Sequence, residues 1–177
     1  FVGSTGAGKT TITNLLNRFY DIQSGSITID GVDVRDVTQQ ALREQLGYVP
    51  QKAFLFSGTI ESNVAYADEG MSVDRIREAV DIAQASEFVA SKEEGLGTRV
   101  SQGGSNVSGG QRQRLAIARA LATEARAYLF DDSFSALDYK TDAALRQALH
   151  TQLGEATVVI VAQRISTVLN ADQIVVL

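Results

Sequence analysis

The sequence predicts an α/β fold with a mostly parallel core sheet and an inserted group of helices. Short apolar runs alternate with stretches of helical periodicity, and a glycine-rich loop joins the first apolar residues to the first helix. The length of 177 residues suits a single domain with an ample core. We therefore expect one domain over 1–177, with a helical subdomain over about 59–122 inserted in it.

Apolar or alternating runs predict the strands, and a period near 3.6 residues predicts the helices. The runs expected to form strands are 1–2, 26–29, 47–49, 127–130, 157–162 and 173–177. The stretches expected to form helices are 11–19, 38–46, 59–94, 112–122 and 140–153. The first helix has its apolar positions on one face, at Ile12, Leu15, Leu16 and Phe19.

Three signals set boundaries between these elements. A turn at Asp30 and Gly31 ends the second strand. Pro50 stops the third strand because proline has no N–H to donate. Ser72 is the expected N-cap of a helix within the long helical stretch.

The loop before the first helix fits the P-loop pattern G-x-x-x-x-G-K-[ST] at every fixed position. It consists of Gly3, Ser4, Thr5, Gly6, Ala7, Gly8, Lys9 and Thr10, and Thr11 follows it. Glycines let the backbone turn tightly, so that its N–H groups and the start of the helix face phosphate oxygens. Lys9 would reach the β- and γ-phosphates, and the Thr10 hydroxyl would bind Mg²⁺. The loop predicts a nucleotide site.

A second candidate for phosphate binding opens the helix expected over 112–122. Its residues are Ser108, Gly109, Gly110 and Gln111. Ser108 is a good N-cap, and a capped helix start with two glycines leaves several N–H groups free to face an anion. Taken alone, this segment is equally consistent with an ordinary glycine-rich loop before a helix.

Two adjacent carboxylates follow the apolar run 127–130. Asp131 and Asp132 stand at the carboxyl end of a strand that is expected to be buried and parallel. In open α/β sheets this position lies beside the P-loop, where a carboxylate can hold Mg²⁺. The pair therefore predicts a metal and catalytic site rather than a solvated turn.

Five segments in this order resemble the nucleotide-binding domain of ABC transporters, and the resemblance covers nearly the whole chain. The segments are the P-loop, 48–51, 107–111, 130–132 and 135–138. In that family they are the Walker A, Q-loop, signature, Walker B and D-loop. The resemblance implies that ATP and Mg²⁺ are bound, with Thr10, Asp131 and Gln51 at the metal. It also implies that Gln51 is catalytic and senses a transmembrane partner. The stretch 54–60 with Asn63 resembles exporters of the multidrug and lipid class.

Two catalytic positions depart from the family pattern. The residue after the Walker B aspartate is usually a glutamate that polarises the attacking water, and here it is Asp132, one methylene shorter. The switch position near the γ-phosphate is usually histidine, and here it is Gln163, which carries no charge near neutral pH. His150, the chain's single histidine, is expected at a helix end on the surface and not as a displaced switch.

The signature keeps its serine, both glycines and its glutamine, whereas the catalytic pair is weakened. This combination resembles one half of a heterodimeric ABC exporter, in which each ATP lies between the Walker motifs of one domain and the signature of the other. The resemblance implies weak hydrolysis at this chain's own site and a signature that completes the partner's site. It also implies transmembrane domains as partners and a location at the cytoplasmic face of a membrane.

Two alternatives remain open from the sequence. One is a soluble ABC-type ATPase of DNA repair or translation, although the net charge of −5 argues against a nucleic-acid surface. The other is a regulatory subunit that binds nucleotide without turnover.

The two ends of the chain are expected to be truncated strands, at 1–2 and 173–177. The basic residues Arg112, Arg114 and Arg119 are expected either on a solvated helix face or in contact with the nucleotide or the loop of Gln111.

Overall fold

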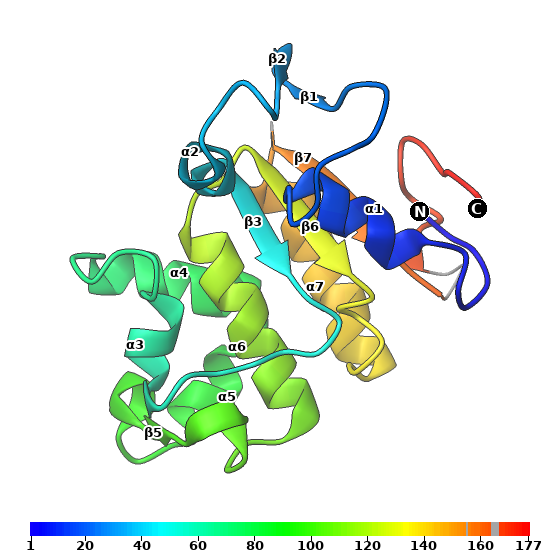
Figure 1. Ribbon diagram of the computed structural model, residues 1–177. Coiled ribbons are helices and arrows are strands. Elements are labelled where there is room, and N and C mark those ends of the chain that lie inside the picture. The colour runs from blue at the N-terminus through cyan, green and yellow to red at the C-terminus, as the bar shows by residue number, and fades with distance from the viewer. Residues whose placement is uncertain (155, 164–166) are drawn as a thin grey trace.

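The computed structural model describes residues 1–154, 156–163 and 167–177. At its centre is a parallel sheet of β3 (Leu46–Val49), β6 (Ala127–Asp131) and β7 (Thr157–Val161), in the order β3-β6-β7. Val2 extends the sheet beyond β7 through isolated parallel bridges to Ala162 and Val176. Parallel strands with helices around them confirm the predicted α/β class (Figure 1).

The helices fall into two groups around this sheet. On the β3 side, Figure 1 shows a cluster of four helices, which are α3 (Ile60–Val64), α4 (Val73–Ile82), α5 (Ser86–Ala90) and α6 (Gly109–Ala122). The others are α1 (Lys9–Leu16), α2 (Gln39–Glu44) and α7 (Tyr139–Gln152). The remaining elements are short: β1 (Thr28–Ile29), β2 (Val32–Asp33), β4 (Gly58–Thr59), β5 (Arg99–Val100) and the 3₁₀ turns η1 (Gly95–Gly97) and η2 (Gln102–Gly104).

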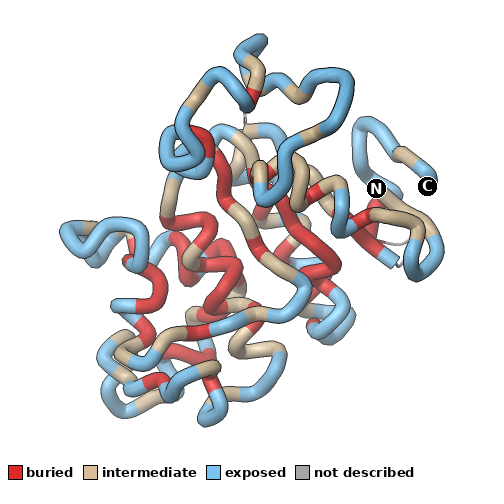
Figure 2. The backbone as a smooth tube through the Cα atoms, viewed as in Figure 1, coloured by how far each residue is buried: buried red, intermediate tan, exposed pale blue. Residues whose placement is uncertain are grey.

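One hydrophobic core joins the sheet to the helical cluster. Figure 2 shows buried residues along β6 and through α6. Phe130, Leu115 and Leu145 are fully buried, and all three belong to this core. A smaller core beneath α2 and the β1–β2 hairpin contains Val34, Leu42, Leu46 and Leu129. The continuous apolar run of β6 follows from burial of both faces of the central strand.

The first helix buries a polar face. Lys9 and Thr13 of α1 and its C-cap residue Asn17 are buried, whereas Phe19, just after the helix, is 45% exposed. Thr13 donates to the backbone oxygen of Thr10, and the Asn17 amide donates to that of Thr13. These bonds satisfy the polar groups that α1 buries against the end of β6. The apolar positions Ile12, Leu15 and Leu16 are only partly buried, so the most buried face of α1 is polar.

Several boundaries also differ from the expectations. The long helical stretch is divided into α3, α4 and α5, and Ser72 caps α4 by accepting a hydrogen bond from the Arg75 N–H. The strand expected over 173–177 is absent, because only Val176 pairs, as an isolated bridge. One bridge cannot form a ladder, so this segment lacks the regular spacing of hydrogen bonds that defines a strand.

Candidate functional site

The predicted site residues meet at the carboxyl edge of the parallel sheet. The P-loop follows Val2, Gln51 follows β3, Asp131 ends β6 and Gln163 follows β7. Since parallel strands place their carboxyl ends on one edge, segments far apart in the sequence converge here. The sequence predicted this convergence for the P-loop and the acidic pair.

The P-loop holds its lysine against its own backbone. The Lys9 ammonium donates to the carbonyl oxygens of Gly3 (2.8 Å) and Ser4 (2.7 Å), and the side chain is largely buried. Gly6 and Gly8 have φ of +85° and +94°, in the left-handed region that favours glycine. The ammonium therefore lies inside the curve of the loop, at the start of α1.

The carboxylate of Asp131 contacts the first turn of α1. The Thr10 hydroxyl donates to Oδ1 (3.2 Å), and the Thr13 hydroxyl lies 3.5 Å from Oδ2. Burial raises the pKa of Asp131, the hydrogen bond from Thr10 opposes this shift, and the neighbouring Asp132 adds to it. Thr13 was not predicted, although its position three residues after Thr10 places both hydroxyls on one face of the helix.

These oxygen atoms suit a magnesium ion. Mg²⁺ prefers hard oxygen ligands and is commonly held by one or two protein groups together with phosphates and water. Thr10 Oγ1 and the Asp131 carboxylate provide such a pair, and a cation would offset the crowding of two adjacent carboxylates. In the part of the chain that the structure describes, no group of three or more His, Cys, Asp or Glu side chains forms a metal site of its own.

Asp132 is held by two amides from the segments that follow β3 and β7. The Gln163 amide donates to Asp132 Oδ2 over 3.0 Å, and the Gln51 amide donates to the same oxygen over 3.2 Å. Asp132 is 8% exposed, and its φ of +47° lies in the left-handed region, which aspartate and asparagine tolerate better than most residues. The sequence predicted these three residues as catalytic, but it did not predict that they contact one another.

The signature segment forms a capped helix start. The Ser108 hydroxyl accepts a hydrogen bond from the Gln111 N–H, and the Gln111 side chain accepts one from the Ser108 N–H. Ser108 and Gly109 are exposed. Figure 1 shows this end of α6 well apart from the loop before α1. A phosphate at the P-loop therefore cannot also contact this chain's own signature.

The three arginines of α6 donate hydrogen bonds to neighbouring segments of the chain. Arg112 donates to the carbonyl oxygens of Gly103 and Gly104, and Arg114 donates to that of Gln84. Arg119 donates to the backbone and side-chain oxygens of Asn63. Each guanidinium satisfies carbonyls of a different neighbouring segment, so these residues fix α6 within the helical cluster. They are therefore not a solvated face, whereas contact with a nucleotide stays a prediction.

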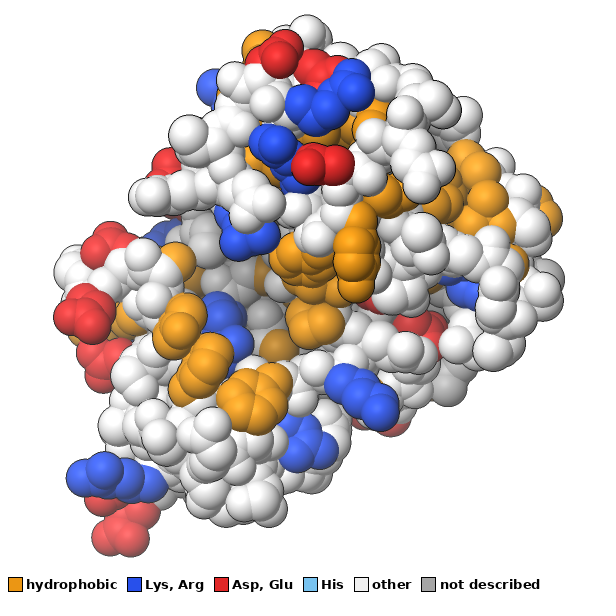
Figure 3. Space-filling view, in the orientation of Figure 1, with side chains coloured by type: hydrophobic (Ala, Val, Ile, Leu, Met, Phe, Trp, Pro, Cys, Tyr) orange, Lys and Arg blue, Asp and Glu red, His pale blue; other side chains and the backbone are white. Residues whose placement is uncertain are grey.

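An aromatic cluster lies on the surface near Arg119. The rings of Phe56 and Tyr66 are stacked at 4.3 Å, Phe54 packs edge-on to Phe56, and the guanidinium lies 5.1 Å from the centre of the Phe56 ring. Tyr66 is 57% exposed and Phe54 45% exposed. Figure 3 shows hydrophobic side chains gathered on this face beside a hollow.

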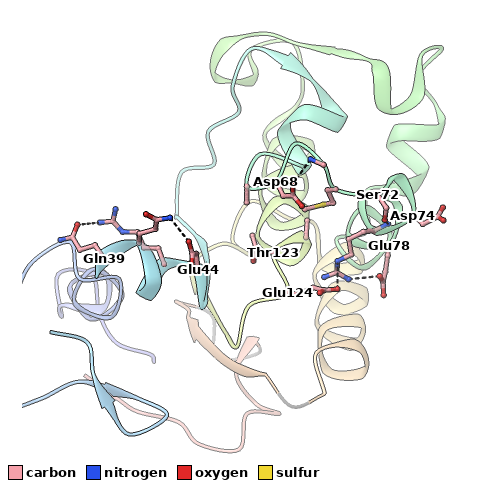
Figure 4. A pocket seen from close by; sticks show the side chains of 15 residues that line it. Gln39, Glu44, Asp68, Ser72, Asp74, Glu78, Thr123 and Glu124 are labelled. Atoms are coloured by element: carbon pink, nitrogen blue, oxygen red, sulfur yellow. Dashed lines mark hydrogen bonds and ion pairs between the residues drawn. The ribbon is translucent and has the colours of Figure 1, made fainter. Parts of the chain in front are cut away.

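The hollow is an open groove of about 1260 Å³ between α2 and the helical cluster. Figure 4 shows Gln39 and Glu44 of α2 on one side and Asp74 and Glu78 of α4 on the other. Glu124 lies between them and pairs with Arg75. The residues that line this groove do not include those of the P-loop or the acidic pair, so the groove is separate from the phosphate site.

Among the described residues, no helix is both long enough and apolar enough to cross a membrane. His150 lies on the surface in the last turn of α7, as expected.

Comparison with known proteins identifies this arrangement. A model of the ABC transporter family matches residues 1–135. The chain is 47% identical, over 99% of its length, to an uncharacterized ABC transporter ATP-binding protein of Mycobacterium tuberculosis, of which it covers 30%. It is 45% identical, over 99% of its length, to the ATP-dependent lipid A-core flippase of Desulfotalea psychrophila, of which it covers 31%.

A solved structure gives the same result for the fold. A bacterial Atm1-family ABC exporter with ATP bound superposes with a TM-score of 0.95 and 42% identity, over 99% of this chain and 31% of the exporter chain. The chain thus spans about a third of the length of the relatives that it matches. Its P-loop, acidic pair and capped signature lie on the fold of that exporter's nucleotide-binding domain, and the chain belongs to the ABC transporter family as an ATP-binding domain.

Proposed function

We propose that this chain is the ATP-binding domain of one half of a heterodimeric ABC exporter. In this proposal its own ATP site binds nucleotide tightly and hydrolyses it slowly, and its signature completes the competent site of the partner. The single observation that carries the proposal is that the Gln163 and Gln51 amides both donate hydrogen bonds to Asp132 Oδ2. Asp132 stands where the glutamate that polarises the attacking water is usual, and these bonds engage one of its two carboxylate oxygens.

The binding half of the proposal rests on the P-loop. The backbone N–H groups of 3–11 and the Lys9 ammonium would hold the phosphates of ATP. Thr10, Asp131 and Gln51 would hold Mg²⁺, which neutralises charge on the β- and γ-phosphates when bound. Because Gln51 gives its NH₂ group to Asp132, its carbonyl oxygen is the atom left for a metal.

The slow hydrolysis rests on the length and partners of Asp132. A carboxylate one methylene shorter than glutamate is drawn back by about 1 Å, and misplacement on this scale can cost on the order of a hundredfold in rate. Gln163 is neutral and already donates to this carboxylate. Neither residue therefore supplies the charged or fully extended group that the usual glutamate and histidine would supply.

The partners follow from the separation of the two phosphate-binding segments. Because the P-loop and the start of α6 lie far apart in one chain, a second ABC domain is required to enclose each ATP. Transmembrane domains would account for the remaining length of the exporter, with this domain on the cytoplasmic side. The groove beside α2 and the aromatic cluster of Phe54, Phe56 and Tyr66 are the surface that we assign to the membrane part. The inserted helical subdomain over about 59–122 would contribute Tyr66 and α4 to that contact.

The two alternatives are less well supported. The lipid A-core flippases among the relatives favour an exporter over a soluble ATPase of DNA repair or translation. The intact capped signature favours a chain that takes part in turnover over a purely regulatory subunit, because a regulatory subunit has no need of an exposed helix start of this kind.

The test is single-turnover hydrolysis in the assembled transporter with the partner's catalytic glutamate replaced by glutamine. We expect the site built on Lys9 and Asp131 to hydrolyse ATP on the order of a hundredfold more slowly than the partner's site does in a transporter that keeps that glutamate. Changing Asp132→Glu together with Gln163→His restores the usual groups and should raise the rate measurably. Hydrolysis at the full rate by the unmodified chain would show that Asp132 is a working base and that the site is not degenerate.

A further inference from the structure

The amides around Asp132 have only one orientation that fits their partner. A carboxylate oxygen accepts hydrogen bonds and donates none, so both glutamines must turn their NH₂ groups towards Oδ2. The carbonyl oxygen Oε1 of each amide then faces away from Asp132. Gln163 is exposed, and no described residue donates a hydrogen bond to its Oε1.

Hydrolysis of a phosphate needs little covalent help from the protein. The transition state is loose, so the main task is to place a water molecule in line with the bond that breaks. A glutamine amide does this in other phosphate-transfer sites by accepting a hydrogen bond from the water. An oriented amide with an unused carbonyl oxygen can therefore accept a hydrogen bond from such a water.

We propose that Gln163, through Oε1, orients the attacking water at this chain's own ATP site, and that Asp132 is a positioning residue for the Gln163 amide instead of the base. The proposal rests on the proposed function, because it explains how a site without the usual glutamate and histidine keeps a low rate. It reverses the expected roles: Asp132 fixes the donor end of the amide, and the acceptor end contacts the substrate water.

The step balances without a side-chain base. The water oxygen forms a bond to the γ-phosphorus while the bond from that phosphorus to the β,γ-bridging oxygen breaks, and ADP leaves with the bonding pair. One water proton stays on the new hydroxyl and the other passes to a phosphate oxygen. The products are ADP and dihydrogen phosphate, and Gln163 is unchanged.

The backbone around Asp132 supports a positioning role. The Asp132 N–H donates to the carbonyl oxygen of Val161 on β7, and the Ser135 hydroxyl donates to the carbonyl oxygen of Asp132. These bonds fix the residue between the strand ends that carry Gln51 and Gln163. Its left-handed φ suits aspartate and asparagine, so an asparagine at this position keeps both the backbone and one acceptor oxygen.

The test uses the full-length transporter with the partner's glutamate changed to glutamine, so that single-turnover hydrolysis reports this chain's site. Asp132→Asn keeps an acceptor for the amides but cannot act as a base, and we expect its rate to stay within about threefold of the unmodified chain. Asp132→Ala and Gln163→Met, which remove the acceptor and the amide, should each lower the rate by about tenfold or more. Gln152→Met at the exposed end of α7, outside the groove and the ATP site, is the matched control and should have no effect.

The amount of ATP bound at this site is measured in every variant and should be unchanged, which separates a positioning role from loss of folding. The proposal is overturned if Asp132→Asn loses as much rate as Asp132→Ala, or if Gln163→Met keeps the full rate. These outcomes compare variants with the unmodified chain, so they differ from failure of the proposed function, which concerns the absolute rate of the unmodified site.

Discussion

Changing Lys9→Ala should abolish tight binding of Mg-ATP at this chain's P-loop. The ammonium is largely buried and now donates to two carbonyls of the loop, so it is already placed where phosphate oxygens would replace one of those acceptors. Loss of a charged hydrogen bond in a site shielded from water costs about 2–4 kcal/mol, which corresponds to roughly 30- to 1000-fold in affinity. Titration calorimetry of the assembled transporter measures this change directly.

Lys92→Ala provides the matched control, because it removes the same charge near the end of α5, far along the chain from the P-loop. Its ATP affinity should equal that of the unmodified protein. Equal affinity in Lys9→Ala and Lys92→Ala would mean that the P-loop lysine does not contact the phosphates.

A second large effect is expected at the signature. Gly109→Glu should stop most turnover of the assembled pair while ATP binding at this chain's own P-loop survives. A Cβ added at Gly109 would have no described atom of a neighbouring segment within 4 Å, so the substitution should cause no clash within this chain. The introduced carboxylate would instead face the γ-phosphate held by the partner's P-loop, where like charges repel. Ser108→Arg should act similarly through its bulk, but it also removes the helix cap.

The matched control for the signature is Ser108→Thr, which keeps a hydroxyl to accept the hydrogen bond from the Gln111 N–H. Steady-state ATPase activity of the transporter and ATP binding by this chain are measured together. A normal ATPase rate in Gly109→Glu would show that this helix start does not act across the interface.

How far the sequence predicts the site depends on whether the relevant contacts are local. The P-loop, the cap at Ser108 and the strand that ends in Asp131 are set by neighbouring residues, and the structure places each as expected. The capping box, for example, needs only residues 108 and 111, which are three positions apart. The fold class followed from the same kind of short-range pattern.

The sequence could not predict contacts between distant segments. The amides of Gln51 and Gln163 meet Asp132 only because β3, β6 and β7 are neighbours in the sheet, and the strand order is not written in any local pattern. Arg119 likewise contacts Asn63, which lies on α3. The buried polar face of α1 has the same cause, since Thr13 is buried by the position of Asp131.

These contacts show that the two unusual residues have to be considered as one unit. Asp132 and Gln163 are separate departures in the sequence, but in the structure they form one hydrogen-bonded unit with Gln51. A substitution at one of them therefore alters the partners of the others, and their effects on rate should not be additive.

The most direct test of the central claim follows the nucleotide through many cycles. A photoreactive ATP carrying a labelled γ-phosphate is bound to both sites of the assembled transporter, and the label on each chain is measured after several turnovers. Our account predicts that the γ-label stays on this chain while the partner's site loses its label in each cycle. Loss of the γ-label from both chains at the same rate would contradict the account.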